Sequence, residues 1–95
     1  MATIEQQAEI ARTITGSKLS TEEIVIRVQN IDPFTKEKAC PKVHQMVLEY
    51  NIPFDKAFPI IRSGFNEIAK EHKINPAVLF WIYMDWMKEN NINHQ

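Results

Sequence analysis

The chain contains little of the material from which catalytic and metal sites are usually built. Its single cysteine, Cys40, excludes an internal disulfide and suits a reducing compartment, so we expect a cytoplasmic protein. Only two of its 95 residues are glycine, Gly16 and Gly64, and they are isolated from each other. The sequence therefore lacks a glycine-rich loop that would hold a phosphate group.

The chain also lacks an excess of charge of either sign. It has 11 basic and 12 acidic residues and a net charge of −1. This balance excludes the basic excess of a nucleic-acid-binding arm and the acidic run of a mimic tail. The first residues have no basic segment followed by an apolar core, so they predict a first helix and no secretory signal.

Side chains that bind metals or attack substrates are few. Thiol and imidazole groups are limited to Cys40, His44, His72 and His94, without the spacing of a zinc site, so we expect no metal and no cofactor. Cys40 and His44 lie one turn apart at a predicted helix start, where a thiolate is stabilised. No third residue orients the histidine and no glycine-rich loop offers an oxyanion hole, so we expect a non-enzymatic protein.

The longest apolar stretch, PAVLFWIYMDWM, runs from Pro76 to Met87 and contains one charged residue, Asp85. It is too short to cross a membrane, which takes about 20 residues. On a helix its apolar side chains cover more than half the circumference, whereas a surface helix needs a stripe only modestly wider than about 100°. We predict that this helix, capped by Asn75 and ending in a left-handed turn at Asn90-Asn91, is central to a bundle or shared with a partner.

Two large apolar residues of this helix, Val78 and Trp81, fall on its otherwise polar side. One interpretation is that neighbouring helices wrap the helix completely and that Trp81 belongs to the core. The other is that Val78 and Trp81 form a docking spot for a partner, with Asp85 and Lys88 at its rim. The sequence alone leaves both interpretations open.

Two shorter helices are predicted before this one in the first third of the chain. Residues 3–15 form an amphipathic helix closed by Gly16, and a terminal helix with so thin an apolar face packs loosely or docks on another subunit. Its apolar positions are Ile4, Ala8, Ala11 and Ile14. Ser20 and Glu23 form a capping box that opens a second helix, although the β-branched run that follows also resembles a strand. The inward positions of that helix are Ile24, Val25, Val28 and Ile31.

Two proline-bounded segments, residues 30–41 and 51–59, precede the next two predicted helices. In each segment we expect the phenylalanine, Phe34 or Phe54, to fill the bundle and the later proline to start a helix. The predicted helices are Pro41 to Tyr50, and from between Asp55 and Pro59 to about His72. Their inward positions are Val43, Met46, Val47 and Tyr50 in the first and Ile61, Phe65, Ile68 and His72 in the second. Gly64 inside the second helix predicts close approach of another helix.

The stretch IAKEHKINPAVLFWI resembles a helix-turn-helix motif over about one fifth of the chain. The matching positions are Ala69, Ile74, Leu79 and Ile82. The turn glycine is replaced by Lys73, and the outward positions of the second helix carry no side chain that reads base edges. Those outward positions are Pro76, Ala77, Phe80 and Trp81.

A DNA-binding protein of this kind would use nearby lysines to contact phosphate. The candidates are Lys36, Lys38, Lys42, Lys70 and Lys73. Acidic residues such as Glu37, Glu67 and Glu71 are interleaved with them, so an ion-paired, solvated surface also explains these lysines.

We therefore expect a single all-α domain over residues 1–95, with residues 1–3 and 92–95 frayed. Its predicted architecture is a small irregular or orthogonal bundle of about five helices around an apolar C-terminal helix. The predicted function is that of an intracellular protein-interaction module, such as an adaptor, inhibitor or regulatory subunit, that binds another protein or a second copy of itself. The alternative is a helix-turn-helix-like DNA-binding regulator; no membrane association is expected.

Overall fold

The chain forms an all-α bundle, as predicted. The computed structural model describes residues 4–90, apart from the side chain of Asp55, and the fraying predicted for residues 1–3 and 92–95 lies outside that range. Its helices are α1 (Ile4–Thr15), α2 (Thr21–Gln29), α3 (Pro33–Tyr50), α4 (Phe54–Glu71) and α5 (Pro76–Glu89). No strand occurs within these residues. The radius of gyration, 12.2 Å, is close to the roughly 12 Å of a compact domain of this length.

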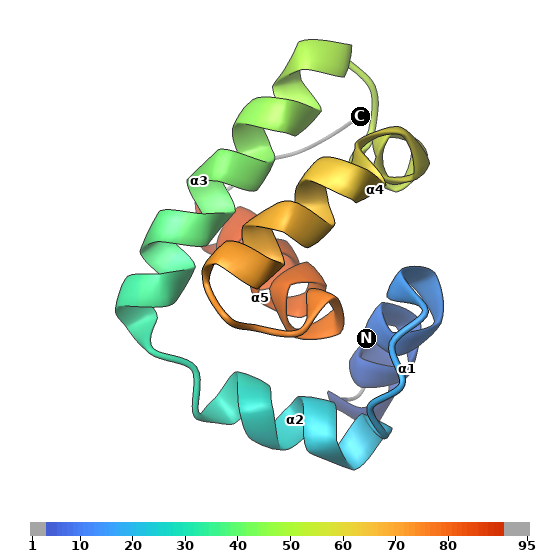
Figure 1. The fold of residues 1–95 in the computed structure, drawn as a ribbon, viewed down its shortest axis with the longest axis vertical. Helices are drawn as coiled ribbons and strands as arrows, with labels where there is room; N and C mark the ends of the chain where they lie inside the picture. Colours follow the sequence, from blue (N-terminus) through green and yellow to red (C-terminus); the bar gives the residue numbers. More distant parts are fainter. Residues whose placement is uncertain (1–3, 91–95) are drawn as a thin grey trace.

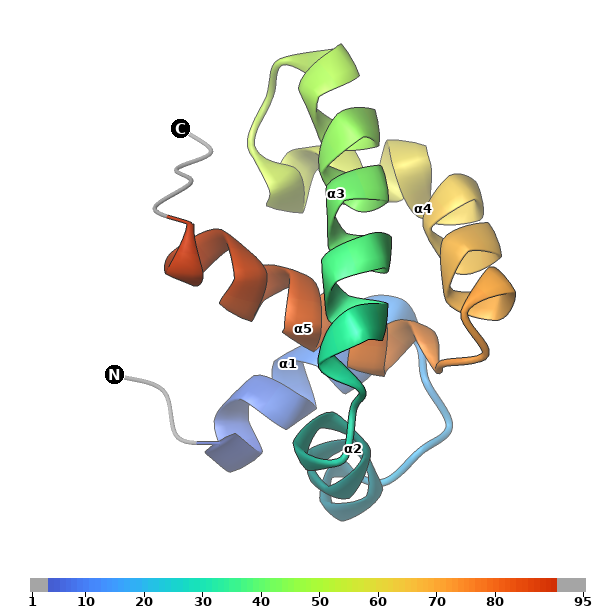
Figure 2. The same ribbon diagram turned by 90° about the vertical axis from the view of Figure 1, so that its left-hand side faces the viewer.

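Helix α5 occupies the centre of the bundle. It contacts each of the other four helices, which surround it in Figure 1, and α3 crosses it steeply in Figure 2. Eight of its 14 residues are buried, including Leu79, Ile82 and Tyr83. Trp81 is only 7 % exposed, so the interpretation that places this indole in the core is confirmed.

An aromatic cluster joins the start of α4 to α5. The ring centroid of Phe80 lies 5.3 Å from that of Phe54 and 5.6 Å from that of Phe58, and Phe54 lies 4.7 Å from Tyr83. The rings are tilted or edge-on, which are the arrangements that aromatic pairs prefer. Phe54 is buried, which confirms the prediction that it fills the bundle.

Helix α3 begins at Pro33, well before the predicted start at Pro41. The Asp32 side chain caps it by accepting a hydrogen bond from the Phe34 N–H at 3.0 Å. Pro33 takes the first helical position, where a backbone N–H would have no partner within the helix, so the lack of one in proline costs nothing. Pro41 therefore lies inside the helix, on its exposed side. An interior proline costs about 3 kcal/mol. The buried stripe that continues past it offsets this cost; it consists of Ala39, Cys40, Val43 and Val47.

Two side chains of α3 lie on the outside although they were expected inside. Phe34 is 60 % exposed and sits under the Lys38 ammonium group, 4.6 Å from the ring centroid. Tyr50 is also exposed. Both predictions are wrong: the earlier helix start places Phe34 on the solvent-facing side of the first turn, and Tyr50 is the last residue of the helix.

Helix α4 begins at Phe54, so Pro59 also falls inside a helix instead of starting one. The predicted inward residues Ile61, Phe65 and Ile68 are buried. His72 follows the last helical residue and is half-buried. The close approach predicted at Gly64 is confirmed, because a Cβ at that position would lie 2.7 Å from the Met46 Sδ of α3.

Helices α1 and α2 form as predicted. Gly16 ends α1 with a positive φ of 68°. Ser20 Oγ accepts a hydrogen bond from the Glu23 N–H at 3.2 Å, and the β-branched run that follows is helical. Ile24 is buried, whereas Val25, Val28 and Ile31 are half-buried against the core.

The turn between α4 and α5 contains a lysine in the left-handed conformation. Lys73 has a φ of 58°, and the following Ile74 N–H donates to the Ala69 carbonyl at 2.9 Å, a bond typical of a Schellman motif. The Asn75 side chain then caps α5, as predicted, by accepting from the Ala77 N–H at 2.9 Å. Lys73 thus adopts the left-handed conformation that a glycine usually adopts in this kind of turn.

The predicted left-handed end of α5 is not formed at Asn90. That residue has a φ of −102°, and its side-chain amide instead donates to the Trp86 carbonyl at 2.8 Å. Asn91 lies outside the described residues.

Replacing Lys73 by glycine should stabilise the protein. The left-handed conformation costs a non-glycine residue about 1–2 kcal/mol, and the entropy that glycine adds to the unfolded chain removes about 0.4–1 kcal/mol of that gain. We expect Lys73→Gly to raise the free energy of unfolding in urea by roughly 0.5–1 kcal/mol. Lys70→Gly, one turn earlier in the helix, should lower it by about 1 kcal/mol. A neutral or destabilising Lys73→Gly would show that the turn is not left-handed there.

Candidate functional site

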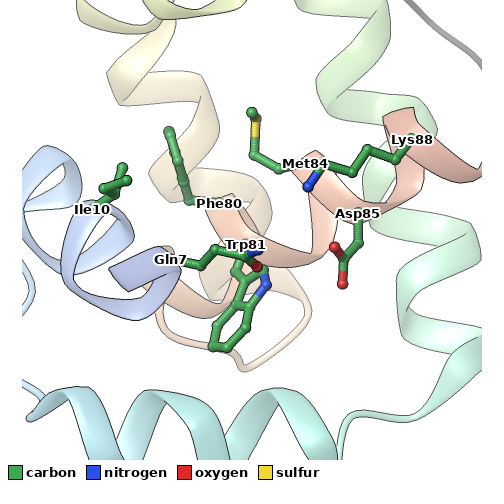
Figure 3. A pocket seen from close by; sticks show the side chains of 7 residues that line it. All are labelled: Gln7, Ile10, Phe80, Trp81, Met84, Asp85 and Lys88. Carbon is green, nitrogen blue, oxygen red and sulfur yellow. The ribbon is translucent and has the colours of Figure 1, made fainter. Parts of the chain in front are cut away.

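A shallow hollow lies along the seam between α1 and α5, and we call it the α1–α5 groove. It has a volume of about 100 Å³ and is lined by Gln7, Ile10, Phe80, Trp81, Met84, Asp85 and Lys88 (Figure 3). Pockets for small molecules usually measure about 300–1,000 Å³. The groove is therefore too small for a typical metabolite or cofactor, but it has room for one apolar side chain.

Helical spacing brings the lining residues to one edge of each helix. On α5, Phe80, Met84 and Lys88 recur every fourth residue, and in Figure 3 Phe80 and Met84 project from the same side. Gln7 reaches from α1 across to α5 in the same view. Asp85 and Lys88 contribute one negative and one positive charge, so the groove has a predominantly apolar lining with a rim of mixed sign.

Helix α1 turns its small residues inward and its large apolar residues outward. Ala8 and Ala11 are fully buried, whereas Ile10 is 49 % and Ile14 is 38 % exposed. Small side chains let the backbone of α1 approach the bundle closely, whereas residues 4–90 cover Ile10 and Ile14 only in part. The predicted apolar face is therefore confirmed only for its alanines, which are buried, whereas Ile4 is 50 % and Ile14 38 % exposed.

The docking spot predicted around Val78 and Trp81 needs a correction. Val78 is 1 % exposed, because α5 lies between its neighbours with no bare side at that position, so Val78 is not available to a partner. Trp81, Asp85 and Lys88 do line a common surface feature, the α1–α5 groove. Sequence reasoning missed Ile10 and Gln7, although the spacing of Gln7, Ile10 and Ile14 places all three on one edge of α1.

Two of the five predicted phosphate-binding lysines are ion-paired. Lys36 Nζ lies 2.7 Å from Glu89 Oε1, and Lys42 Nζ lies 3.0 Å from Glu71 Oε1. The hydrogen bond from Lys42, together with its charge, holds the pKa of the Glu71 carboxyl below its usual value. Lys70 and Lys73 are exposed at the end of α4, and Glu71, the partner of Lys42, lies between them in the sequence.

The helix-turn-helix resemblance extends to the shape of α4 and α5 but not to a recognition surface. Ala69, Leu79 and Ile82 are buried, as the motif requires. A recognition helix needs a free face to enter the major groove, which is about 12 Å wide. The positions that would form that face, Ala77, Phe80 and Trp81, are buried among the neighbouring helices.

The surroundings of Cys40 do not activate a nucleophile. Because α3 starts at Pro33, Cys40 lies in the middle of the helix and gains no stabilisation from its N-terminus. Burial raises the pKa of its thiol from 9.0 to about 12, against an opposing effect of the Lys36 charge. His44 Nδ1 lies 3.2 Å from the Tyr83 hydroxyl, and its ring packs against Trp86 at 5.4 Å. The premise that Cys40 occupies a helix start is wrong.

Three further observations bear on the kind of site present. Among the described residues, no group of three or more histidine, cysteine, aspartate or glutamate side chains is placed to hold a metal ion; His94 lies outside them.

Within the same part of the chain, every helix is either too short or too polar to traverse a bilayer. Comparison with known protein families, curated proteins and solved structures finds no match to this chain. By fold, the protein belongs to the class of small all-α bundles with a central helix.

Cys40 should be unreactive in the folded protein. With a thiol pKa near 12 and no exposed surface, we expect no reaction with Ellman's reagent at pH 8 until urea unfolds the chain. Above about pH 9 the unfolded chain loses this proton while the folded chain keeps it, so the free energy of unfolding should fall as the pH rises, by up to about 1.4 kcal/mol per pH unit. Cys40→Ala should weaken this dependence between pH 8 and 10. Rapid labelling of the folded protein would contradict the burial.

A second expectation concerns DNA. Because the outward positions of α5 are buried and two of the lysines are ion-paired, micromolar protein should not retard a random-sequence duplex in a gel shift at low salt. Retardation that weakens steeply with added salt would show that another surface binds phosphate.

Proposed function

We propose that this protein is a non-enzymatic protein-interaction module that receives an apolar side chain of another polypeptide in the α1–α5 groove. The observation that supports the proposal is the position of Ile10, which is half exposed and lines the same hollow as two aromatic side chains, Phe80 and Trp81. Its single cysteine is a buried free thiol, so the proposal places this module in a reducing compartment such as the cytoplasm.

The chemistry of the groove matches the usual anatomy of a protein interface. Interfaces have an apolar centre, enriched in aromatic residues and methionine, within a polar rim. Here Phe80, Trp81 and Met84 supply the centre, and Asp85 and Lys88 supply the rim. Full burial of an isoleucine is worth about 1.5–3 kcal/mol, so covering the exposed half of Ile10 would contribute about 1 kcal/mol to binding.

The alternative function, a DNA-binding regulator, is not retained. It depends on α5 as a recognition helix, and α5 contacts all four other helices. A helix enclosed in this way cannot lie in a DNA groove without prior loss of the core around Phe80 and Trp81.

The proposal is tested by a charge placed in the groove. Trp81→Ala is unsuitable, because truncating a buried tryptophan costs about 3–5 kcal/mol of stability. Ile10→Lys instead changes an exposed position of α1, so the fold should persist while a cation disfavours entry of an apolar side chain. We expect affinity capture from a native lysate to recover a specific partner, or added copies of the chain itself, with wild type and not with Ile10→Lys.

A matched control is available on α4. Ile60 is 55 % exposed and does not line the α1–α5 groove, so Ile60→Lys introduces the same change elsewhere on the surface. It should behave as wild type, and both variants should retain the wild-type helical circular dichroism. Equal recovery with all three proteins, or no specific recovery with any of them, would refute the proposal.

A further inference from the structure

Another, larger hollow lies between the link from α2 to α3 and the turn from α4 to α5, and we call it the polar pocket. It has a volume of about 330 Å³, within the range of about 300–1,000 Å³ that is usual for small-molecule sites. Its lining includes two cations, two uncharged hydrogen-bond donors and two aliphatic side chains: Arg27, Lys73, Thr35, Asn75, Ile31 and Ile74. The pocket therefore differs from the α1–α5 groove in both size and chemistry.

Hydrogen bonds within the protein already engage acceptor atoms of this lining. The side-chain oxygen of Asn75 accepts from the Ala77 N–H and from the Ser17 hydroxyl, each at 2.9 Å. One carboxylate oxygen of Asp32, which also lines the pocket, accepts a hydrogen bond at the start of α3. The amide nitrogen of Asn75 and the hydroxyl of Thr35 are left as uncharged donors, so the pocket suits a ligand rich in acceptors.

The charges of the pocket favour an anion. Arg27 and Lys73 contribute two positive charges against the one negative charge of Asp32. The Nε of Arg27 lies 3.1 Å from Glu23 Oε1, and this bond leaves the two terminal nitrogens of the guanidinium group for another acceptor. Among the described side chains, none forms an ion pair with Lys73. A free ammonium group and a partly engaged guanidinium group therefore belong to the same pocket.

The backbone conformation of Lys73 is a separate observation. Its φ of 58° lies in the left-handed region, which glycine adopts at no steric cost and lysine does not. Strained residues of this kind gather at functional sites, where the surrounding structure holds them in place. A glycine would serve the turn better, so the turn itself does not account for a lysine at this position. The side chain that glycine would lack belongs to the lining of the polar pocket.

From these observations we infer that the polar pocket binds a small organic phosphomonoester. Such a group carries a charge of about −1.5 to −2 near pH 7 and three strong acceptor oxygens, which match two cations and two uncharged donors. Arginine and lysine both bind phosphate through charge-assisted hydrogen bonds. The organic part of the ligand packs against Ile31 and Ile74. The inference goes beyond the proposed function and does not rest on it.

Titration of the isotope-labelled full chain with phenyl phosphate, followed by NMR, tests the inference. We choose about 0.1 M salt, which screens isolated surface charges. Phenyl phosphate should shift the amide signals of Thr35, Ile74 and Asn75 with a Kd of about 1 mM or below. Inorganic phosphate, which lacks the apolar ring, should bind at least about threefold more weakly. Phenol, the uncharged counterpart, should bind at least about tenfold more weakly.

Three variants show which lysine is responsible. Lys73→Gln should weaken the binding of phenyl phosphate at least about tenfold, because it removes a charge-assisted hydrogen bond. Lys70→Gln removes the same charge three residues earlier, outside the lining of the pocket, and should bind within about twofold of wild type. Lys73→Gly should lose binding as Lys73→Gln does while raising the urea midpoint, so that unfolding is excluded as the cause.

Four results would overturn the inference. The first is phenyl phosphate that leaves these three amide signals unshifted at about 10 mM. The second is equal weakening by Lys70→Gln and Lys73→Gln, which assigns binding to surface charge in general. The third is equal binding of phenol and phenyl phosphate, which assigns binding to the ring alone. The fourth is inorganic phosphate that binds as tightly as phenyl phosphate, which excludes an organic ligand. None of these results affects the test of the α1–α5 groove with Ile10→Lys.

Discussion

The enclosure of α5 is the constraint on which the rest of the structure depends. This helix has apolar side chains around most of its circumference, and a fold that left any side of it bare would forfeit several kcal/mol of burial. Four helices of 9–18 residues cover it, each from a different direction. Each of the other helices therefore packs against α5, and the α1–α5 groove lies at the edge of this packing.

The turns at the ends of the helices hold this enclosure in place. Asn75 Oδ1 caps α5 and also accepts a hydrogen bond from the Ser17 hydroxyl at 2.9 Å, which ties the α1–α2 loop to the start of the central helix. Arg62 of α4 donates to the Thr15 carbonyl at 3.1 Å, at the end of α1. These polar links fix the C-terminal end of α1 and the loop after it relative to α4 and α5. The alanines of α1 make its packing contact with the bundle, and its isoleucines face outward beside the groove.

Much of the fold was predictable because the signals are local. Ser20, Asn75 and Gly16 mark helix ends through chemistry confined to a few residues, and the structure confirms all three. The start of α3 was missed because two prolines competed for the same role. Asp32-Pro33 and Pro41 each suit a helix start, and the choice depends on whether the stripe through Ala39 and Cys40 is covered by other helices, which no local pattern reveals.

The sequence by itself determined that the chain is helical, that its last helix is the most apolar, and that Gly64 lies at a close contact, since each follows from periodicity, capping or the absence of a side chain. Only the tertiary structure decided which apolar residues are covered. Val78 and Ile10 are both β-branched aliphatic residues on helices, yet one is buried and the other half exposed. The difference arises because the burial of a residue depends on which helix from a distant part of the chain packs against it. The groove between α1 and α5 depends on the same long-range packing.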